Sequence, residues 1–276
     1  MVDCAVMLQG LLRGGRAWCG AVALLWVVAC GSADDRGVFD AATAGNGTGG
    51  SGAGTGGSKP GGSAGAPDRA GTSSVTPEQC QSACAGIGTC RAAVCVITCD
   101  AQNPCTSEVR CPDGVPCQVE CTAPGSCANA IDCQGSASCV VSCASEDTCS
   151  GNIRCGGSSC EVRCEKQGSC KSEVRCDAAR CDLRCKGQNS CPAKLSCSGA
   201  SSECVVECSG QSACQNLIES EALTETRVTC AAGNCPALIS CGGATCQVGC
   251  EEQACSGGAC CKAQECNLSG IQDTCP

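Results

Sequence analysis

The stretch CEVRCEKQGSCKSEVRCDAARC, residues 160–181, decides the fold of this chain. It contains Cys160, Cys164, Cys170 and Cys176, and ends on Cys181, where the next copy of the same pattern begins. We label the four cysteine positions of one copy a, b, c and d. The spacing from a to b leaves three residues between them, whereas five residues separate b from c and c from d.

Eight copies of this unit run from residue 95 to residue 261 with a period of 20 to 23 residues. A period of this length is typical of solenoids, in which each repeat packs on its neighbours. The a positions of the eight copies are Cys95, Cys117, Cys139, Cys160, Cys181, Cys204, Thr226 and Cys246.

Aliphatic residues recur at two fixed places in the unit. Midway between a and b the sequence has Ile97, Val119, Val141, Val162, Leu183, Val206, Val228 and Val248. Two residues before d it has Val109, Ile131, Ile153, Val174, Leu195, Ile218 and Ile239. Apolar residues and cysteines alternate with polar residues around both places, which indicates strands. Each unit is therefore predicted to be two short strands joined by tight polar corners.

A lone pair of such strands is not stable, but stacked copies can pair strand on strand around one narrow interior. We therefore predict an all-β fold, a small disulfide-stapled β-solenoid of about eight two-stranded coils over residues 95–261. At about 4.8 Å per coil it would be roughly 38 Å long. Residues 77–94 and 262–276 are predicted to be terminal caps. An irregular array of small disulfide-rich domains is the alternative.

The composition of the chain agrees with a thin tube and excludes several functions. The 276 residues include 39 Cys, 37 Gly, 1 Phe and 2 Trp, with no Tyr or His, so an ordinary hydrophobic core cannot form. The net charge of -9 argues against nucleic-acid binding. No Ser-His-Asp, Cys-His, phosphate-loop or dinucleotide motif is present in the sequence. We predict a protein that is not an enzyme and uses no cofactor.

Disulfides are the predicted state of the cysteines, rather than a metal–thiolate cluster. Thiolate clusters use denser spacing than the three- and five-residue intervals here, and export favours oxidation. The seventh copy indicates the pairing, because d is replaced by Ser220 and the following a by Thr226 while the neighbouring cysteines remain. If d bonded to the next a, both would be lost together without leaving a free thiol. Bridges between stacked coils are the alternative.

This reasoning predicts fourteen disulfides. Those that join d to the next a are Cys111–Cys117, Cys133–Cys139, Cys155–Cys160, Cys176–Cys181, Cys197–Cys204 and Cys241–Cys246. By elimination, those that join b to c are Cys99–Cys105, Cys121–Cys127, Cys143–Cys149, Cys164–Cys170, Cys185–Cys191, Cys208–Cys214, Cys230–Cys235 and Cys250–Cys255. Loop-closure entropy gives each about 2 kcal/mol.

The caps also contain cysteines. In the N-terminal cap, Cys84–Cys90 and Cys80–Cys95 would leave no thiol unpaired. In the C-terminal cap the spacing assigns no pairing to Cys260, Cys261, Cys266 and Cys275.

The N-terminal residues predict export and a lipid anchor. Arg13 and Arg16 precede an apolar run that ends in Val27-Val28-Ala29-Cys30, so residues 1–29 are predicted to be a signal peptide, too short to span a bilayer. Translation from Met7 instead of Met1 would give a signal of more ordinary length. The junction resembles the lipobox of bacterial lipoproteins. That resemblance, which covers residues 1–32, implies that Cys30 carries a thioether-linked diacylglycerol and an acylated amino group. Because Gly rather than Asp follows Cys30, it also implies the outer membrane.

Parity agrees with lipidation, because removing Cys4, Cys19 and Cys30 from the 39 cysteines leaves 36. Residues 30–76 are then a lipidated N-terminus and a tether whose Gly, Ser, Thr and Ala residues favour a disordered coil.

These observations predict a lipid-anchored protein of the bacterial cell envelope that is a structural or interaction module. Its partners would be the membrane, through the lipid, and an unidentified protein or surface polymer. A thiol-based metal or redox scavenger is the alternative function. A hydrolase of surface polymers has only the solenoid shape in its favour. The outward rows are mixed (Thr98, Glu120, Ser142, Arg163), unlike the Thr ranks of the insect antifreeze solenoids that the plan resembles.

The stacking also predicts which outward residues become neighbours. Arg154 should lie beside Arg175 on one face, and Arg163 beside Arg184 on the other. These arginines stand amid Glu161, Glu173 and Asp182. A small basic patch of this kind would suit an anionic partner, although a solvated surface of mixed sign contributes little energy.

Overall fold

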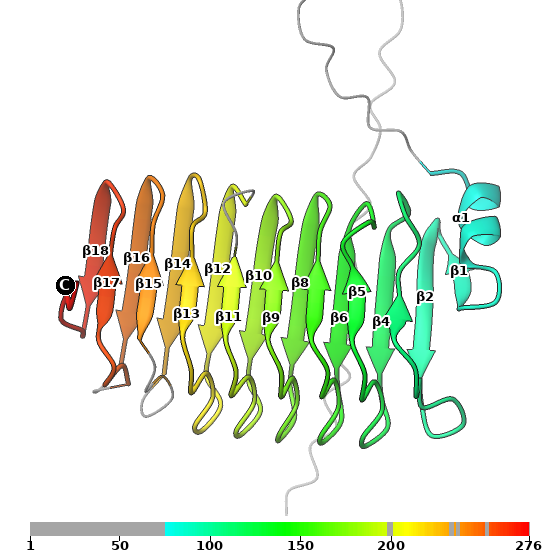
Figure 1. Ribbon diagram of the computed structural model, residues 1–276, viewed down its shortest axis with the longest axis horizontal. Coiled ribbons are helices and arrows are strands. Elements are labelled where there is room, and N and C mark those ends of the chain that lie inside the picture. Colours follow the sequence, from blue (N-terminus) through cyan, green and yellow to red (C-terminus); the bar gives the residue numbers. More distant parts are fainter. Residues whose placement is uncertain (1–74, 198–200, 232–234, 236–237, 252–253, 276) are drawn as a thin grey trace, which may run out of the picture. The chain divides into compact units, whose positions relative to one another are not determined.

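The computed structural model describes residues 75–197, 201–231, 235, 238–251 and 254–275. This part of the chain is almost entirely β, and forms a β-solenoid of about eight turns with disulfides stapling the coils, as the repeat predicted. Each coil contributes one strand to each of two sheets, and the coils succeed one another along the solenoid in sequence order (Figure 1). The predicted Cys30, signal peptide and tether lie outside the described residues.

The larger sheet, sheet A, has ten strands in spatial order of sequence. They are β1 (Thr89–Arg91), β2 (Val94–Cys99), β4 (Cys117–Cys121), β6 (Cys139–Cys143), β8 (Ser159–Cys164), β10 (Arg180–Cys185), β12 (Glu203–Cys208), β14 (Glu225–Cys230), β16 (Thr245–Cys250) and β18 (Glu265–Ser269).

The smaller sheet, sheet B, has eight strands. They are β3 (Val109–Arg110), β5 (Ile131–Cys133), β7 (Ile153–Cys155), β9 (Val174–Cys176), β11 (Leu195–Cys197), β13 (Ile218–Ser220), β15 (Ile239–Cys241) and β17 (Ala259–Cys261).

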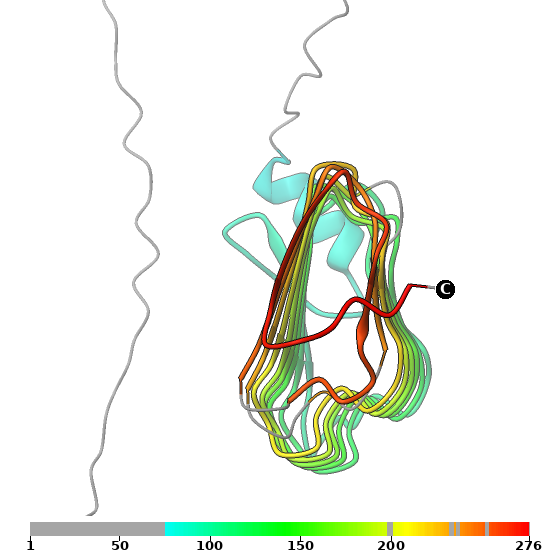
Figure 2. The same cartoon turned by 90° about the vertical axis from the view of Figure 1, so that its left-hand side faces the viewer.

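The coils stack in register, so equivalent residues of successive copies become neighbours. Between β8 and β10, Cys160 pairs with Cys181, and Val162 with Leu183. All the strand pairs of the described region are parallel except β1 and β2, which are antiparallel. Viewed end-on, the coils superimpose and the two sheets face each other across a narrow interior (Figure 2).

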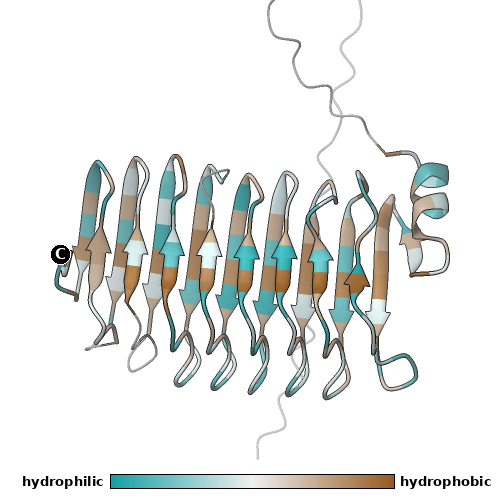
Figure 3. Ribbon diagram, in the orientation of Figure 1, coloured by the Kyte–Doolittle hydropathy of each residue, from teal (hydrophilic) through white to brown (hydrophobic). Residues whose placement is uncertain are grey.

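The interior is filled by the two aliphatic places of the repeat and by the cystines. Apolar stretches recur at the same level of the strands from coil to coil (Figure 3). Burying one such Val, Ile or Leu side chain contributes about 1.5–3 kcal/mol. The largest side chains less than 2 % exposed are Ile131, Ile153, Leu183, Leu195, Ile218, Ile239, Val119, Val141, Val162, Val174, Val206 and Val228.

The corner between b and c turns sharply at the c cysteine. Cys105, Cys127, Cys149, Cys170, Cys191 and Cys214 all have φ between 48° and 54°, in the left-handed region. That conformation costs an L-residue about 1–2 kcal/mol, so it persists only where the surroundings hold it. Close stacking of the corners also requires glycine, because a Cβ at Gly187 would lie 2.0 Å from the carbonyl oxygen of Lys166 in the coil before.

A helix precedes the first coil, and we did not predict it from the repeat. Helix α1 (Pro77–Cys84) begins with a capping box, in which the Thr76 side chain accepts from the Gln79 amide and the Gln79 side chain accepts from the Thr76 amide. The signal was readable as Thr76-Pro77-Glu78-Gln79, a hydroxyl followed by proline and, three residues on, by glutamine. The helix packs on β1 and β2.

The repeat continues into the predicted C-terminal cap. Strand β18 pairs with β16 in the same parallel register as the earlier coils. The chain then crosses to β17, where the Ala259 amide donates to Gln272 and the Thr274 amide donates to Ala259. These bonds cover the outer edge of β17, while β18 is the last strand of sheet A.

Candidate functional site

Two columns of cystines run along the solenoid, one at each corner of the coil. In the structure all fourteen predicted pairs are disulfides, six joining d to the next a and eight joining b to c. Their Cα–Cα distances are 5.3 to 6.2 Å, within the usual range for a cystine. The strand from a to b is thus bridged at both ends, which fixes its position relative to both corners.

The one gap in these columns lies where the sequence lacks both cysteines. Ser220 Oγ and Thr226 Oγ1 are 2.6 Å apart and share a hydrogen bond in the position of the missing disulfide. Both side chains are buried, at 2 % and 0 % exposure. A buried hydroxyl without a partner is costly, so the two polar residues depend on each other as the two cysteines of a bridge would.

The N-terminal cap pairs its cysteines differently from the expected parity solution. The bridges are Cys80–Cys90 and Cys84–Cys95, not Cys84–Cys90 and Cys80–Cys95. Residues four apart lie on the same face of a helix, so Cys80 and Cys84 of α1 stand one turn apart. The antiparallel pairing of β1 and β2 sets Cys90 opposite Cys95. The direction of the helix axis then determines which of the two helix cysteines pairs with Cys90 and which with Cys95. The repeat contains no information on that direction.

The C-terminal cap contains the bridges Cys261–Cys266 and Cys260–Cys275. The first has the d-to-next-a spacing of the repeat, and the second attaches the crossing segment to β17. All 36 cysteines from Cys80 to Cys275 are therefore in disulfides.

We call each cystine of a column a rung. The sulfur atoms of successive rungs also approach one another. In several places three sulfurs, two from one bridge and one from the next, lie within 4.8 Å of each other. Such groups include Cys99 with Cys121 and Cys127. In the other column, the sulfurs of Cys111 and Cys133 are 2.9 Å apart. Three thiolates at this spacing could bind a soft metal ion, but only after reduction of the bridge that they include.

On the outward face of sheet A, an acidic and a basic residue lie two positions apart within β8 and again within β10, so that residues of like charge are in register between these two strands. Arg163 bonds to Glu161 at 2.7 Å, and Arg184 lies 2.6 Å from Asp182 and 3.6 Å from Glu161. These contacts confirm that Arg163 and Arg184 are neighbours. The hydrogen bond from Arg163 to Glu161 raises the pKa of that arginine, and the bond to Asp182 does the same for the pKa of Arg184.

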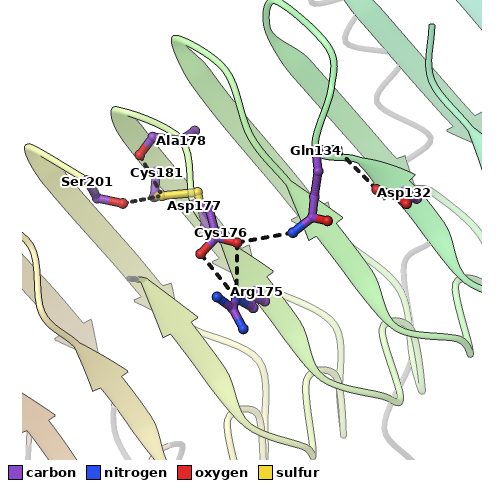
Figure 4. Close-up of polar contacts among 8 residues, drawn as sticks. All are labelled: Asp132, Gln134, Arg175, Cys176, Asp177, Ala178, Cys181 and Ser201. Carbon is purple, nitrogen blue, oxygen red and sulfur yellow. Dashed lines mark hydrogen bonds and ion pairs between the residues drawn. A yellow bond between two sulfur atoms is a disulfide. The ribbon is translucent and has the colours of Figure 1, made fainter. Parts of the chain in front are cut away.

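On the outward face of sheet B, Arg154 and Arg175 are paired neighbours, as predicted. Arg175 bonds to Asp177 at 3.0 Å, and Asp177 also accepts from the side chain of Gln134, two coils away (Figure 4). The sequence did not reveal this second contact, because it skips a coil. Gln134, Arg154 and Arg175 line a depression of about 310 Å³, with Glu173 also on its wall.

The charge of this depression is mixed. Arg154 lies in register between Asp132 and Arg175. Lys194, one coil further along sheet B, is bonded to Glu219, and this bond raises the pKa of the lysine. The face therefore presents a fixed pattern of charges of both signs, which suits recognition of a complementary surface better than capture of a simple anion.

No family model matches this chain, and no curated protein or solved structure is significantly similar to it. Within the described region, no helix is long and apolar enough to cross a membrane.

Proposed function

We propose that this protein is a lipid-anchored component of a bacterial cell envelope, in which the solenoid serves as a rigid structural or interaction module without catalytic activity. The observation that carries the proposal is that cystines brace the sheet A strands from β2 to β16 at both ends, with β14 as the one exception. Bridges to both corners hold β8 and β10 in register, and with them the outward ion pairs of Glu161 and Asp182.

Rigidity of this kind favours binding rather than turnover. A surface that is already ordered loses little conformational entropy when a partner binds, whereas catalysis usually needs a cleft that excludes water. The depression beside Arg154 and Arg175 is lined mainly by polar atoms and has charges of both signs on its wall. A protein or a surface polymer with a complementary charge pattern is the partner that we propose.

The lipid anchor is proposed from the lipobox resemblance at Cys30 and from the parity of the cysteines. Multiple acyl chains would give stable attachment, where a single chain gives only marginal binding. Intact mass of the native protein, taken after alkylation with and without reductant, tests cleavage before Cys30, lipidation and disulfide number together. The mature chain should gain mass from acylation, take up alkyl groups only after reduction, and leave the membrane fraction when Cys30 is replaced by Ser. An unmodified Cys30, or membrane attachment that survives Cys30→Ser, would reject the anchor.

The interaction role is tested by site-specific photo-crosslinking in intact cells. A crosslinker at Arg154 on sheet B, or at Arg163 on sheet A, should give a discrete adduct with an envelope component. The same two variants kept in the dark are the matched control and should give none. The absence of adducts at every outward position, together with no envelope phenotype on deletion, would contradict the interaction role.

The second candidate, a thiol-based scavenger of metals or oxidants, is favoured by the sulfur groups that lie within 4.8 Å of one another. It requires many free thiols in the native protein, whereas the structure has all 36 cysteines of the described part in bridges. Counting reactive thiols on protein taken directly from the envelope separates the two functions. A count near zero supports the structural or interaction module, and a count of many thiols per chain supports the scavenger.

A further inference from the structure

The cystines at the b–c corner form an unbroken column of eight rungs, from Cys99–Cys105 to Cys250–Cys255. The b cysteines of neighbouring coils are paired in parallel register along sheet A, as Cys164 is with Cys185. Partners on adjacent strands are about 4.8 Å apart, which lies within the Cα range of 4.4–6.8 Å that a disulfide can span. A bridge between coils is therefore sterically available beside each bridge within a coil.

Sulfur positions agree with this backbone geometry. Cys143 lies within 4.8 Å of both sulfurs of the next rung, and so does Cys164 of the rung after it. Most of these sulfurs are buried, at 0 to 1 % exposure for Cys121, Cys143 and Cys164. A soluble reductant cannot reach such a bond directly.

The ends of the two columns are more accessible than the middle. Cys105, in the first rung of the b–c column, is half-buried. Cys266, in the last rung of the d–a column, is exposed. A reductant would therefore react first at a terminal rung.

We propose that the two cystine columns are paths for thiol–disulfide exchange, along which a thiol pair formed at an accessible rung moves to buried rungs. In the first step, one thiolate of the reduced rung attacks a sulfur of the next rung, so that an S–S bond between coils forms and the bond within the next rung breaks. The sulfur that leaves takes up a proton. In the second step, the remaining thiol of the first rung, as thiolate, attacks the bond between coils and closes its own rung. The next rung then holds both thiols. The only electrons required are the pair that a small dithiol reductant supplies at the start.

The gap at Ser220 and Thr226 interrupts the d–a column. Thr226 is paired in register with Cys204 on one side and with Cys246 on the other. Those two cysteines are two coils apart, about 9.6 Å, which no direct bridge can span. The C-terminal rungs Cys241–Cys246 and Cys261–Cys266 should therefore exchange with each other and not with Cys197–Cys204.

The gap also allows a test that needs no reductant. The variant Thr226→Cys places one thiol within the column, where it can attack Cys204 and release Cys197, or attack Cys246 and release Cys241. Each attack forms one S–S bond and breaks one. The matched control is Thr229→Cys, because Thr229 is exposed on the outward side of the same strand, β14.

Both full-length variants are held at acid pH, raised above the ordinary thiol pKa of about 8.5 for increasing times, and then acidified. Alkylation in acidic denaturant followed by peptide mapping locates the thiol. In Thr226→Cys, label should move with time from residue 226 first to Cys197 and Cys241, and then to the bridges beside them, because Cys197 is in register with Cys176 and Cys241 with Cys261. In Thr229→Cys it should stay at residue 229.

Label that remains wholly at residue 226 would overturn the proposal, since the buried sulfurs would then be too constrained to align for attack. Label spread equally into the b–c column would also overturn it, because that result indicates general unfolding and scrambling. Should Thr226→Cys fail to fold, Ser220→Cys tests the same column from the other side, next to Cys197 and Cys241.

A limiting amount of dithiol applied to the unsubstituted full chain tests migration of a thiol pair. Thiols should pass from Cys261–Cys266 to Cys241–Cys246 and stop there. In the variant Ser220→Cys/Thr226→Cys they should continue to Cys197–Cys204. Thiols that reach Cys197 and Cys204 equally in both proteins would contradict a path along the column.

Discussion

A disulfide between positions 220 and 226, where the d–a column has its gap, should stabilise the coils on either side. The double substitution Ser220→Cys/Thr226→Cys replaces a hydrogen bond of 2.6 Å by a covalent bridge. The neighbouring rungs, Cys197–Cys204 and Cys241–Cys246, have Cα–Cα distances of 6.2 and 6.1 Å, and the strands that carry the gap are in register with them. A bridge is therefore compatible with the backbone.

The expected magnitude follows from two opposing terms. Closing a loop of about seven residues contributes roughly 2 kcal/mol through the entropy of the open chain. Against this, Ser220 Oγ accepts a hydrogen bond of 3.4 Å from the Ala222 amide, and loss of that bond costs about 1 kcal/mol or less. The net gain should be about 1–2 kcal/mol.

Hydrogen exchange of the β13 and β14 amides is the suitable assay, because it reports local opening while the other bridges hold the chain together. A gain of 1–2 kcal/mol should slow exchange there by about 5- to 30-fold. The matched variant Cys197→Ser/Cys204→Thr should accelerate exchange in β11 and β12 to a similar extent. If both variants left exchange unchanged, or if the new cysteines formed a bridge and exchange became faster, the premise that the cystines stabilise individual coils would be wrong.

Five further substitutions test the interior, the corner hydroxyls and the surface charges, with local hydrogen exchange as the measurement. Ile153→Ala should lower the local opening free energy by about 2–5 kcal/mol, whereas Val140→Ala on the outward side should change it by less than about 0.5 kcal/mol; equal effects would contradict the burial pattern. Ser126→Ala should be neutral or stabilising because its buried hydroxyl has no partner in the described structure, while Ser190→Ala should lose about 1 kcal/mol with its 2.7 Å bond to a backbone carbonyl; the reverse order would refute the assignment. Arg184→Met should destabilise by no more than about 1 kcal/mol, less so at high salt, since its ion pairs are partly exposed; a larger loss that salt leaves unchanged would show that they are structural.

The fold could be predicted from the sequence because each type of residue recurs at the same position in every copy of the repeat. Apolar side chains such as Val162 and Leu183 occupy the same phase of every copy, so one alignment determines the strands, the register and the inward face together. The substitution of both cysteines, by Ser220 and Thr226, carried additional information. Because the two cysteines are lost together, the d and a positions that they occupy are expected to pair with each other. The structure replaces that bridge by a hydrogen bond between the same two residues.

The caps could not be predicted in the same way, because each occurs once. The bridges Cys80–Cys90 and Cys84–Cys95 depend on how α1 lies against β1 and β2, and that depends on packing rather than on spacing. The contact of Gln134 with Asp177 was missed for a related reason, because long side chains can reach over an intervening coil.

The outward rows are where function must be sought, and the physics of the solenoid explains why the repeat does not reveal it. Inward positions accept only small or aliphatic groups, because the coils stack at one strand spacing and the narrow interior leaves no room for larger side chains. Outward positions such as Val140, Glu161 and Asp182 occupy one column yet differ in size and charge, because solvent tolerates any of them. The cystines allow the outward residues to vary without loss of stability. With the backbone braced independently of the surface, a charge can be changed on one coil without loss of the fold. Recognition would then depend on the order of charges along the column, which no single copy of the repeat contains.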